Sequence, residues 1–144
     1  MKTLRFEHKD QDKRELFGWI GEACASAEVR NSLGAPITSS AGDVWLVVTK
    51  DNALLGFCAI SRLKSRNAAR MHALYSVDTA LALTVESTLR KAAENEAIAA
   101  GASEISTVDK VERVKVYEFN KWQVTGTRGQ NYRTSSKQLG KVKK

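Results

Sequence analysis

A long amphipathic segment between two β-rich runs constrains this chain more than any other feature. Its apolar positions are Val85, Leu89, Ala92 or Ala93, Ala97 and Ala100, a spacing that predicts a helix over 85–100. Gly101 follows as a C-terminal cap would. Ala69 to Val77 and Glu104 to Val108 are the β-rich runs on either side. Together they form a βαβ unit, which predicts a parallel strand pair in a mostly buried sheet.

The remaining elements follow from local patterns. Leu4 to His8 is a candidate strand, and Asp12 to Ala27 has the apolar spacing of an amphipathic helix. Residues 31–42 hold the only proline with several Gly and Ser, which indicates a loop. Asp43 to Thr49 and Ala53 to Leu63 read as a hairpin, with the 69–77 strand next. A short helix near Val111 and a β region over 123–132 are expected last.

Length and composition limit the class of protein. With 144 residues, 42% of them hydrophobic, we expect a single domain over 1–136 and a basic tail over 137–144. The first ten residues lack an apolar signal core, and no run reaches the ~18 apolar residues of a membrane helix, so we expect a cytoplasmic protein without membrane contact.

Cys24 and Cys58 are expected to be reduced core thiols. No spacing of Cys and His predicts a metal site.

Positive charge is concentrated in the C-terminal part of the chain. Residues 110–144 contain ten Lys or Arg and two Glu, so they account for the whole net charge of +7. A second basic group lies between two predicted strands and comprises Arg62, Lys64, Arg66 and Arg70. Cations beside aromatic residues such as Trp122 and Tyr132 favour binding of nucleic acid or another polyanion. A solvated, solubilising tail is the alternative.

This order of elements resembles that of the GNAT superfamily of N-acetyltransferases. The most specific piece is Tyr117 to Trp122 (YEFNKW), which is similar to the superfamily's "Tyr, Glu, Lys, apolar, Gly, Phe" segment, with Lys121 in place of the glycine. The resemblance implies an α+β fold, with a mixed central sheet of about six to seven strands flanked by helices. Many members pair through edge strands or the C-terminal β region, so a homodimer is one expectation.

The resemblance also implies acetyl-CoA as acyl donor, held between the strand before the long helix and the strand after it. The implied cofactor-binding residues are Tyr75, Val77, Thr84, Val85, Glu86, Ser87 and Thr88. A helix N-terminus favours the anionic pyrophosphate. However, residues 82–87 lack the superfamily's glycines and basic residue, so the resemblance is to a divergent member with a degenerate pyrophosphate loop. A grip by hydroxyls and backbone amides, a different donor, and loss of cofactor binding remain open. Thr84 could instead serve only as a helix N-cap.

Acyl transfer to an amine needs a base for the amine and an acid for the leaving thiolate. Tyr117 matches the tyrosine that the superfamily commonly uses as the acid, and a phenol is a proton donor at neutral pH. Asp109 at the end of a predicted strand is the best-placed base, with His72 and Asp78 behind it. Each also has a purely structural interpretation, as a packed aromatic, a helix cap or a solvent-facing side chain.

Two classes of function follow. The first is an acyltransferase that moves an acetyl or other acyl group from acetyl-CoA to an amine whose identity is open. The second is a catalytically inactive GNAT-fold protein that binds nucleic acid or an acidic protein through its basic C-terminal surface. A nucleobase-modifying enzyme similar in fold to the phage Mom proteins is a variant of the first. The GNAT-like order of elements and the presence of Tyr117 favour the acyltransferase.

Overall fold

The computed structural model describes residues 1–8, 10–26, 42–63, 67–77, 80–110, 122–128 and 132–139. Its first half contains strand β1 (Lys2–Glu7), helix α1 (Asp10–Ala25) and strands β2 (Val44–Lys50), β3 (Ala53–Leu63) and β4 (Ala68–Ser76). Helix α3 (Ala82–Ala99) and strands β5 (Glu104–Lys110), β6 (Gln123–Arg128) and β7 (Tyr132–Gln138) follow. The predicted hairpin, βαβ unit and long helix are confirmed, and α3 begins three residues before its expected start at Val85.

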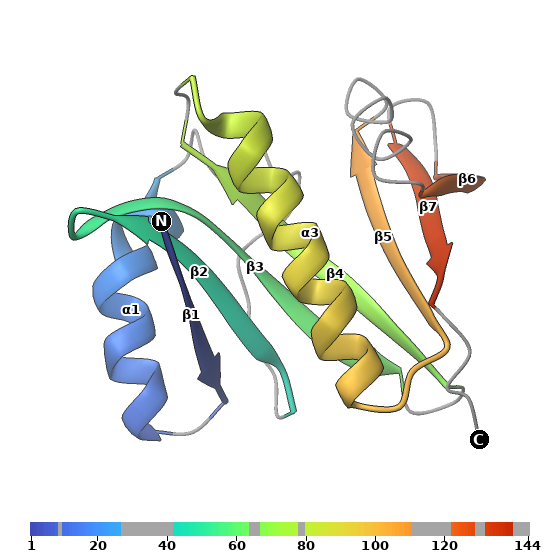
Figure 1. Cartoon of the computed structure of the whole chain (residues 1–144), viewed down its shortest axis with the longest axis horizontal. Coiled ribbons are helices and arrows are strands. Elements are labelled where there is room, and N and C mark those ends of the chain that lie inside the picture. The colour runs from blue at the N-terminus through green and yellow to red at the C-terminus, as the bar shows by residue number, and fades with distance from the viewer. Residues whose placement is uncertain are drawn as a thin grey trace.

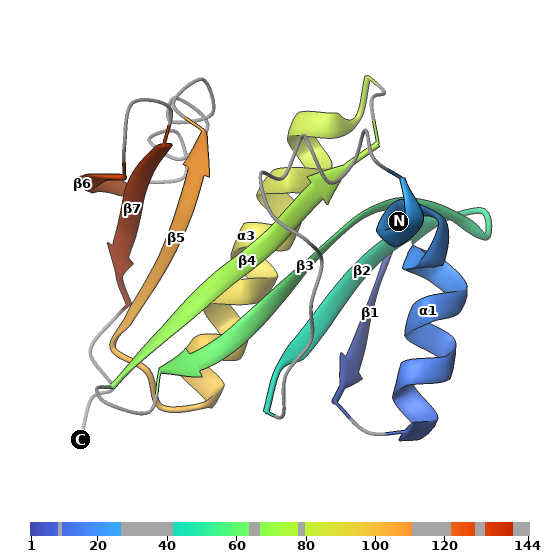
Figure 2. The same ribbon diagram turned by 180° about the vertical axis from the view of Figure 1, so that it is seen from behind.

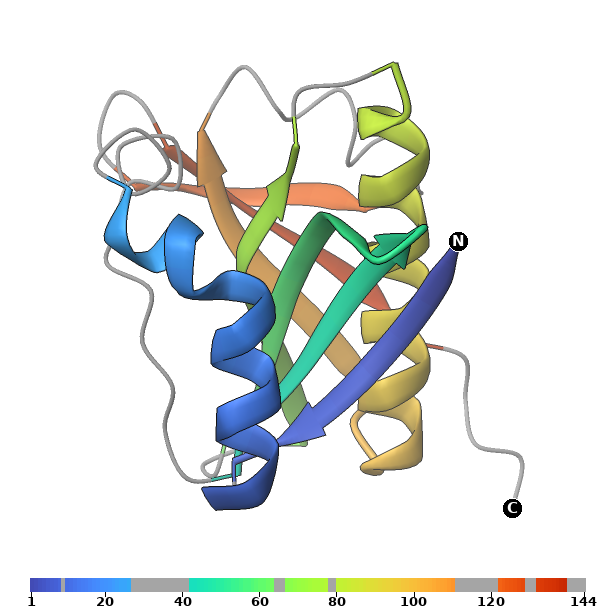
Figure 3. The same cartoon turned by 90° about the vertical axis from the view of Figure 1, so that its left-hand side faces the viewer.

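The seven strands form one sheet in the order β1-β2-β3-β4-β5-β7-β6 (Figure 1). All neighbouring strands are antiparallel except β4 and β5, the pair that α3 connects. Helix α1 covers one face of the sheet and α3 covers the other (Figure 3). The expected α+β class and the mixed central sheet of about six to seven strands are therefore confirmed.

Each face of the sheet buries its own apolar cluster. On β2, Trp45 and Val47 pack toward α1, while Leu46 and Val48 pack toward α3. This alternation follows from the two-residue period of a strand, and burial on both faces explains why β2 reads as a continuous apolar run. The predicted apolar face of the long helix is buried at Val85, Leu89, Ala93 and Ala97.

Helix α3 lies close to the sheet where β3 has a glycine. A Cβ atom at Gly56 would lie 2.6 Å from the Tyr75 carbonyl oxygen and 2.7 Å from Val85 Cγ1. Only a residue without a side chain allows this approach. Gly56 therefore sets the first turns of α3 directly beside the C-terminal end of β4.

Strand β4 contains a bulge that changes which face its side chains meet. Ala73 has φ 54°, and the β3–β4 register shifts opposite it. Before the bulge His72 lies on the α1 face against Trp45, and after it Leu74 packs toward α3 and Tyr75 toward α1. An extra residue in one strand of an antiparallel pair has this effect, because it shifts the two-residue alternation. The bulge thus turns the Tyr75 ring onto the α1 face.

Several other expectations concern the described residues. Cys58 is a free, buried thiol, and burial raises its pKa to about 12, with a smaller opposing effect from Arg90. Strand β7 continues through Lys137 and Gln138, and Leu139 is buried, so the sheet extends past the expected tail boundary at 137.

Within the described ranges no helix is long and apolar enough to cross a membrane. Those ranges also contain no group of three or more His, Cys, Asp or Glu that could hold a metal ion.

Candidate active site at the open end of strand β4

The two parallel strands at the centre of the sheet separate soon after they meet. β4 and β5 are paired only from Ala68 to Arg70 and from Glu104 to Ser106. Beyond these three pairs the strands diverge toward the C-terminal end of β4 (Figure 2). The second half of β4 therefore has a backbone edge that β5 does not cover.

The backbone of Ser76 lies on that uncovered edge. The Val77 N–H donates to the Leu55 carbonyl at 2.8 Å, so residue 77 directs its N–H toward β3. In an antiparallel ladder, neighbouring residues direct their N–H and C=O groups to opposite edges. The N–H and C=O of Ser76, which pairs with Gly56 in the register, consequently point into the gap between β4 and β5.

The N-terminus of α3 lies at the same end of the sheet (Figure 1). Its N-cap residue is Leu81, which makes no side-chain capping hydrogen bond, and its first turn contains no acidic residue. Thr84 is thus not the N-cap, and it is exposed within the first turn. The first backbone N–H groups of a helix have no partner within the helix and carry a partial positive charge, so this end favours an anion.

The other predicted α3 residues differ in what they can offer to a ligand. Val85 and Glu86 are buried, with 1% and 5% of their surface exposed, and the Val85 N–H donates to Leu81 O. Thr88 Oγ1 donates to the Thr84 carbonyl at 2.8 Å, and Ser87 is half-buried. Glu86 lies one turn before Arg90, which is fully buried, on the same side of α3. The side chains of Val85 and Glu86 therefore face the interior rather than the first turn's surface.

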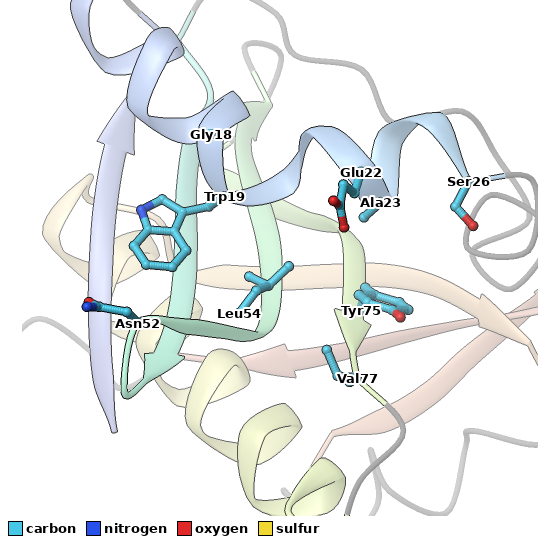
Figure 4. Close-up of a pocket in the computed structure, with 9 residues that line it drawn as sticks. All are labelled: Gly18, Trp19, Glu22, Ala23, Ser26, Asn52, Leu54, Tyr75 and Val77. Atoms are coloured by element: carbon cyan, nitrogen blue, oxygen red, sulfur yellow. The ribbon is translucent and has the colours of Figure 1, made fainter.

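A pocket of about 580 Å³ lies on the α1 face of the same β4 end (Figure 4). Tyr75 and Val77, two residues predicted from the sequence to bind the cofactor, line it. The Tyr75 ring is held against Phe57, with ring centroids 5.3 Å apart. The other described lining residues come from α1 and from the β2–β3 hairpin and are Gly18, Trp19, Glu22, Ala23, Ser26, Asn52 and Leu54.

A polar cluster on the α1 face joins β3, β4 and the residue that precedes β2. Ser61 Oγ donates to Asp43 Oδ1 at 2.7 Å and lies 2.8 Å from His72 Nε2. His72 Nε2 is also 3.6 Å from Asp43 Oδ2. Because the Ser61 proton is directed at the carboxylate, His72 Nε2–H is the donor to Ser61, and Nδ1 is the basic nitrogen of the neutral ring. Burial lowers the pKa of His72, Asp43 opposes this shift and Arg70 adds to it.

This cluster is only partly visible in the sequence. His72 is a candidate base by residue type, but Asp43 and Ser61 are 18 residues apart and share no motif. The antiparallel pairing of β3 and β4 brings these residues together, because it sets Ser61 opposite Arg70 and so beside His72. Ser61 lies between His72 and the Asp43 carboxylate. In a Ser-His-Asp triad the histidine lies between the serine and the aspartate, so this cluster does not have the arrangement of a serine nucleophile.

The remaining predicted residues are placed as follows. Asp109 lies on β5, three residues past the last β4 pairing, opposite Arg133 in the register. Arg62 and Arg70 are exposed on β3 and β4. Lys137 on β7 forms an ion pair with Glu94 of α3 at 2.5 Å. Tyr117, Asp78, Lys64, Arg66, the expected short helix near Val111 and residues 140–144 lie outside the described residues.

Comparison with known proteins identifies the fold. No family sequence model matches the chain, and no curated protein is similar to it in sequence. Among solved structures, an aminoglycoside 6′-N-acetyltransferase from Enterococcus faecium matches with a TM-score of 0.73 and 11% identity, covering 100% of both chains. An acyl-CoA N-acyltransferase from Pseudomonas aeruginosa matches with a TM-score of 0.75 and 11% identity, covering 94% of this chain and 98% of that one.

The Salmonella typhimurium protein yncA, solved with its cofactor acetyl-CoA, has a TM-score of 0.65 and 11% identity, with 100% of this chain and 98% of that chain covered. An acetyltransferase of the GNAT family from Staphylococcus aureus covers 96% of this chain and 100% of its own at 12% identity, with a TM-score of 0.66. At these identities the likeness concerns the fold. This chain has the fold of the GNAT N-acetyltransferases.

Proposed function

We propose that this protein transfers an acyl group from acetyl-CoA or a related acyl-CoA to an amine. The observation that carries the proposal is the position of the C-terminal end of β4. Its backbone edge opens on the gap toward β5, and its Tyr75 and Val77 side chains line a pocket on the α1 face. An acyl-CoA that lies along the β4 edge and an amine that occupies the pocket would therefore meet at the C-terminal end of β4.

The described residues fit an acyl-CoA. The Ser76 N–H and C=O point to an edge of β4 that no described strand covers, and an amide-containing pantetheine arm can pair with this edge. The first-turn amides of α3 and the exposed Thr84 hydroxyl supply donors for phosphate oxygens. Glu86, the residue whose charge speaks against a phosphate here, is buried two residues past Thr84. When bound, acyl-CoA supplies the activated acyl thioester.

The chain's own residues would then orient the donor and move two protons. Ser76 holds the donor along β4, and the pocket positions the acceptor amine beside it. A base must take a proton from the amine, and an acid must give one to the departing sulfur. Asp109 is our candidate base because it lies on the strand across the gap, and Tyr117 is our candidate acid by its match to the GNAT segment.

Calorimetric titration with acetyl-CoA tests the donor site. We expect micromolar binding of acetyl-CoA and of desulfo-CoA, which keeps the phosphates, and much weaker binding of pantetheine, which lacks them. Thr84→Glu should weaken acetyl-CoA binding by about tenfold, because it adds a negative charge where phosphates would lie. Ala100→Glu adds the same charge at the exposed opposite end of α3 and should leave the affinity unchanged.

Absence of binding at millimolar concentrations of acetyl-CoA and of longer acyl-CoAs would refute the proposal. The alternative of a GNAT-fold binding protein without this chemistry would then be favoured. Equal effects of Thr84→Glu and Ala100→Glu would show that the α3 N-terminus does not hold the phosphates.

A further inference from the structure

The pocket on the α1 face contains a carboxylate that no cation neutralises in the described part of the chain. Glu22 is the only Asp, Glu, Lys or Arg among the described residues that line this pocket. Glu96 on α3 is paired with Arg5, whereas Glu22 forms no ion pair with a described Lys or Arg. The described lining therefore carries a negative charge, although the chain as a whole has a formal net charge of +7.

The Glu22 carboxylate lies at the end of β4, where we place the transfer reaction. Figure 4 shows its side chain extending from α1 toward β4, beside Tyr75 and Val77. These two residues flank Ser76, whose backbone edge opens on the gap between β4 and β5. An amine that is attracted by Glu22 is therefore attracted to the end of β4, so a single nitrogen is enough for both binding and transfer.

The other described walls of the pocket suit the uncharged body of such an amine. Trp19 and Tyr75 contribute aromatic rings, which attract an ammonium group. Leu54 and Val77 contribute aliphatic surface, against which apolar groups leave water. A volume of about 580 Å³ lies within the range of small-molecule sites. The described lining is therefore suited to a small organic amine with an apolar body.

A negative group next to the amine would oppose binding. In an α-amino acid the carboxylate is attached beside the amine, so it would approach the Glu22 carboxylate whenever the amine does. Two like charges about 4 Å apart in water cost a factor of about five in affinity. No basic side chain of the described lining offsets this repulsion. The pocket consequently discriminates between acceptors by their charge.

We propose that the acceptor is a small amine with an apolar body and no anionic group, and that Glu22 is the residue that selects it by charge. This deepens the proposed function and rests on it for the transfer step. The bound ammonium group loses one proton to solvent and becomes a neutral amine. Its nitrogen bonds to the acyl carbon of the acyl-CoA, and the base takes a proton from that nitrogen. The carbon–sulfur bond breaks, and the thiolate receives a proton to give free CoA.

Binding can be measured without acyl-CoA, so the test does not depend on the donor. We would titrate the protein near neutral pH with phenylalanine and with phenylalaninamide, which has nearly the same shape but a neutral carboxamide in place of the carboxylate. Leucine and leucinamide give the same comparison with an aliphatic body. Each amide should bind at least about fivefold more tightly than its amino acid. Added salt should reduce the difference, because it screens the exposed Glu22 carboxylate.

Substitutions on α1 test whether Glu22 causes the preference. Glu22→Gln should remove it, and Glu22→Lys should reverse it, because a cation at this position attracts the carboxylate of the amino acid. Glu15→Gln makes the same charge change as Glu22→Gln at an exposed position of α1 outside the described pocket lining, so it should keep the preference intact.

Three results would overturn the inference. They are equal affinities for the amides and their amino acids, a preference that survives Glu22→Gln, and no binding of either amide at millimolar concentration. A separate assay with acetyl-CoA follows the acetylated amides by mass spectrometry. Glu22-dependent binding without any acetylated product would refute the acyltransferase and leave the cation site. Acetylation of amides and amino acids with equal kcat/KM would refute charge selection by Glu22 and keep the acyltransferase.

Discussion

Single residues in this protein acquire their chemistry from partners distant in the chain. His72 is the clearest case, because Ser61 comes from β3, Asp43 precedes β2, and the Trp45 ring packs edge-on at 6.1 Å. These neighbours bury the imidazole, and burial penalises its charged form. The cluster therefore makes the stability of the sheet depend on pH.

The direction of this dependence follows from the lowered pKa of His72. On acidification the unfolded chain takes up the proton near the ordinary value of 6.5, before the folded protein does. The stabilisation is present above pH 6.5 and is lost as the pH falls through the lower folded pKa. As the pH falls below 6.5, we expect the free energy of unfolding to fall by up to about 1.4 kcal/mol per pH unit from this residue.

Urea unfolding at a series of pH values measures this slope. His72→Gln should flatten it, and His8→Gln, which removes the chain's other histidine outside the cluster, should not. Identical slopes for His72→Gln and the unaltered protein would show that His72 does not cause the acid sensitivity.

Tyr117 is a residue-scale prediction that depends on the sequence alone. If its phenol protonates the departing sulfur, Tyr117→Phe should lower kcat by about 10²-fold while leaving acetyl-CoA affinity nearly unchanged. Steady-state kinetics together with calorimetry separates these effects. An unchanged kcat would remove Tyr117 from the mechanism, and a parallel loss of affinity would indicate a packing role.

At the scale of elements, the contact between α3 and β3 positions the candidate donor site. The first turns of α3 approach the sheet over Gly56, next to the Tyr75 carbonyl. The Ala73 bulge in β4 then directs Tyr75 to the α1 face, while the strand's outer edge stays free of β5. The gap and the pocket thus depend on two local irregularities within one regular sheet.

Gly56→Ala tests the close approach. Its Cβ would meet a backbone oxygen at 2.6 Å, so α3 has to shift, and we expect a loss of about 1–3 kcal/mol in the free energy of unfolding. Acetyl-CoA binding should weaken with it, because the N-terminus of α3 moves relative to β4.

Gly21→Ala is the matched control for that substitution. A Cβ atom added at this helical glycine would have no atom within 4 Å apart from its chain neighbours and its own helix backbone, so alanine should raise the free energy of unfolding by about 0.5–1 kcal/mol. Urea unfolding of both variants checks the pair. A Gly56→Ala protein as stable as the parent would mean that α3 and β3 are less closely packed than the structure indicates.

At the scale of the whole molecule, charge is distributed unevenly. Residues 110–144 carry the excess of positive charge, and Arg62 and Arg70 add exposed cations on β3 and β4. The pocket instead presents the Glu22 carboxylate. Among the described residues, the exposed cations Arg62 and Arg70 therefore lie outside the pocket lining.

Removing the terminal cations tests for polyanion binding. Replacing Lys141, Lys143 and Lys144 with Gln should weaken binding of a single-stranded DNA oligonucleotide and reduce the slope of log affinity against log salt by about 0.7 per lost phosphate contact. Replacing Lys2, Lys13 and Lys91 removes the same charge elsewhere and should have a smaller effect. Equal slopes for both triple variants would leave the C-terminal residues without a specific role.

Much of the fold could be predicted because its signals are local. The apolar face of α3 and the hairpin turn at Asp51 and Asn52 depend on residues within a few positions of one another. The cofactor residues were less predictable. Tyr75 and Val77 line the pocket on the α1 face, which we assign to the acceptor, and their predicted role in cofactor binding stays a prediction. Val85 and Glu86 follow from counting along the helix, and counting does not show that both side chains face the interior.

By itself, the sequence determined the order of elements, the βαβ unit and hence the GNAT-like sheet, because hydrophobic periodicity and turn chemistry are properties of short segments. Only the tertiary structure decided where β4 and β5 separate, which face the Ala73 bulge assigns to Tyr75, and that Glu22 meets Tyr75 in one pocket. It also decided that Asp43, Ser61 and His72 form one cluster. Each of these features depends on contacts between segments far apart in the chain, and such contacts exist only once the sheet and both helices have packed together.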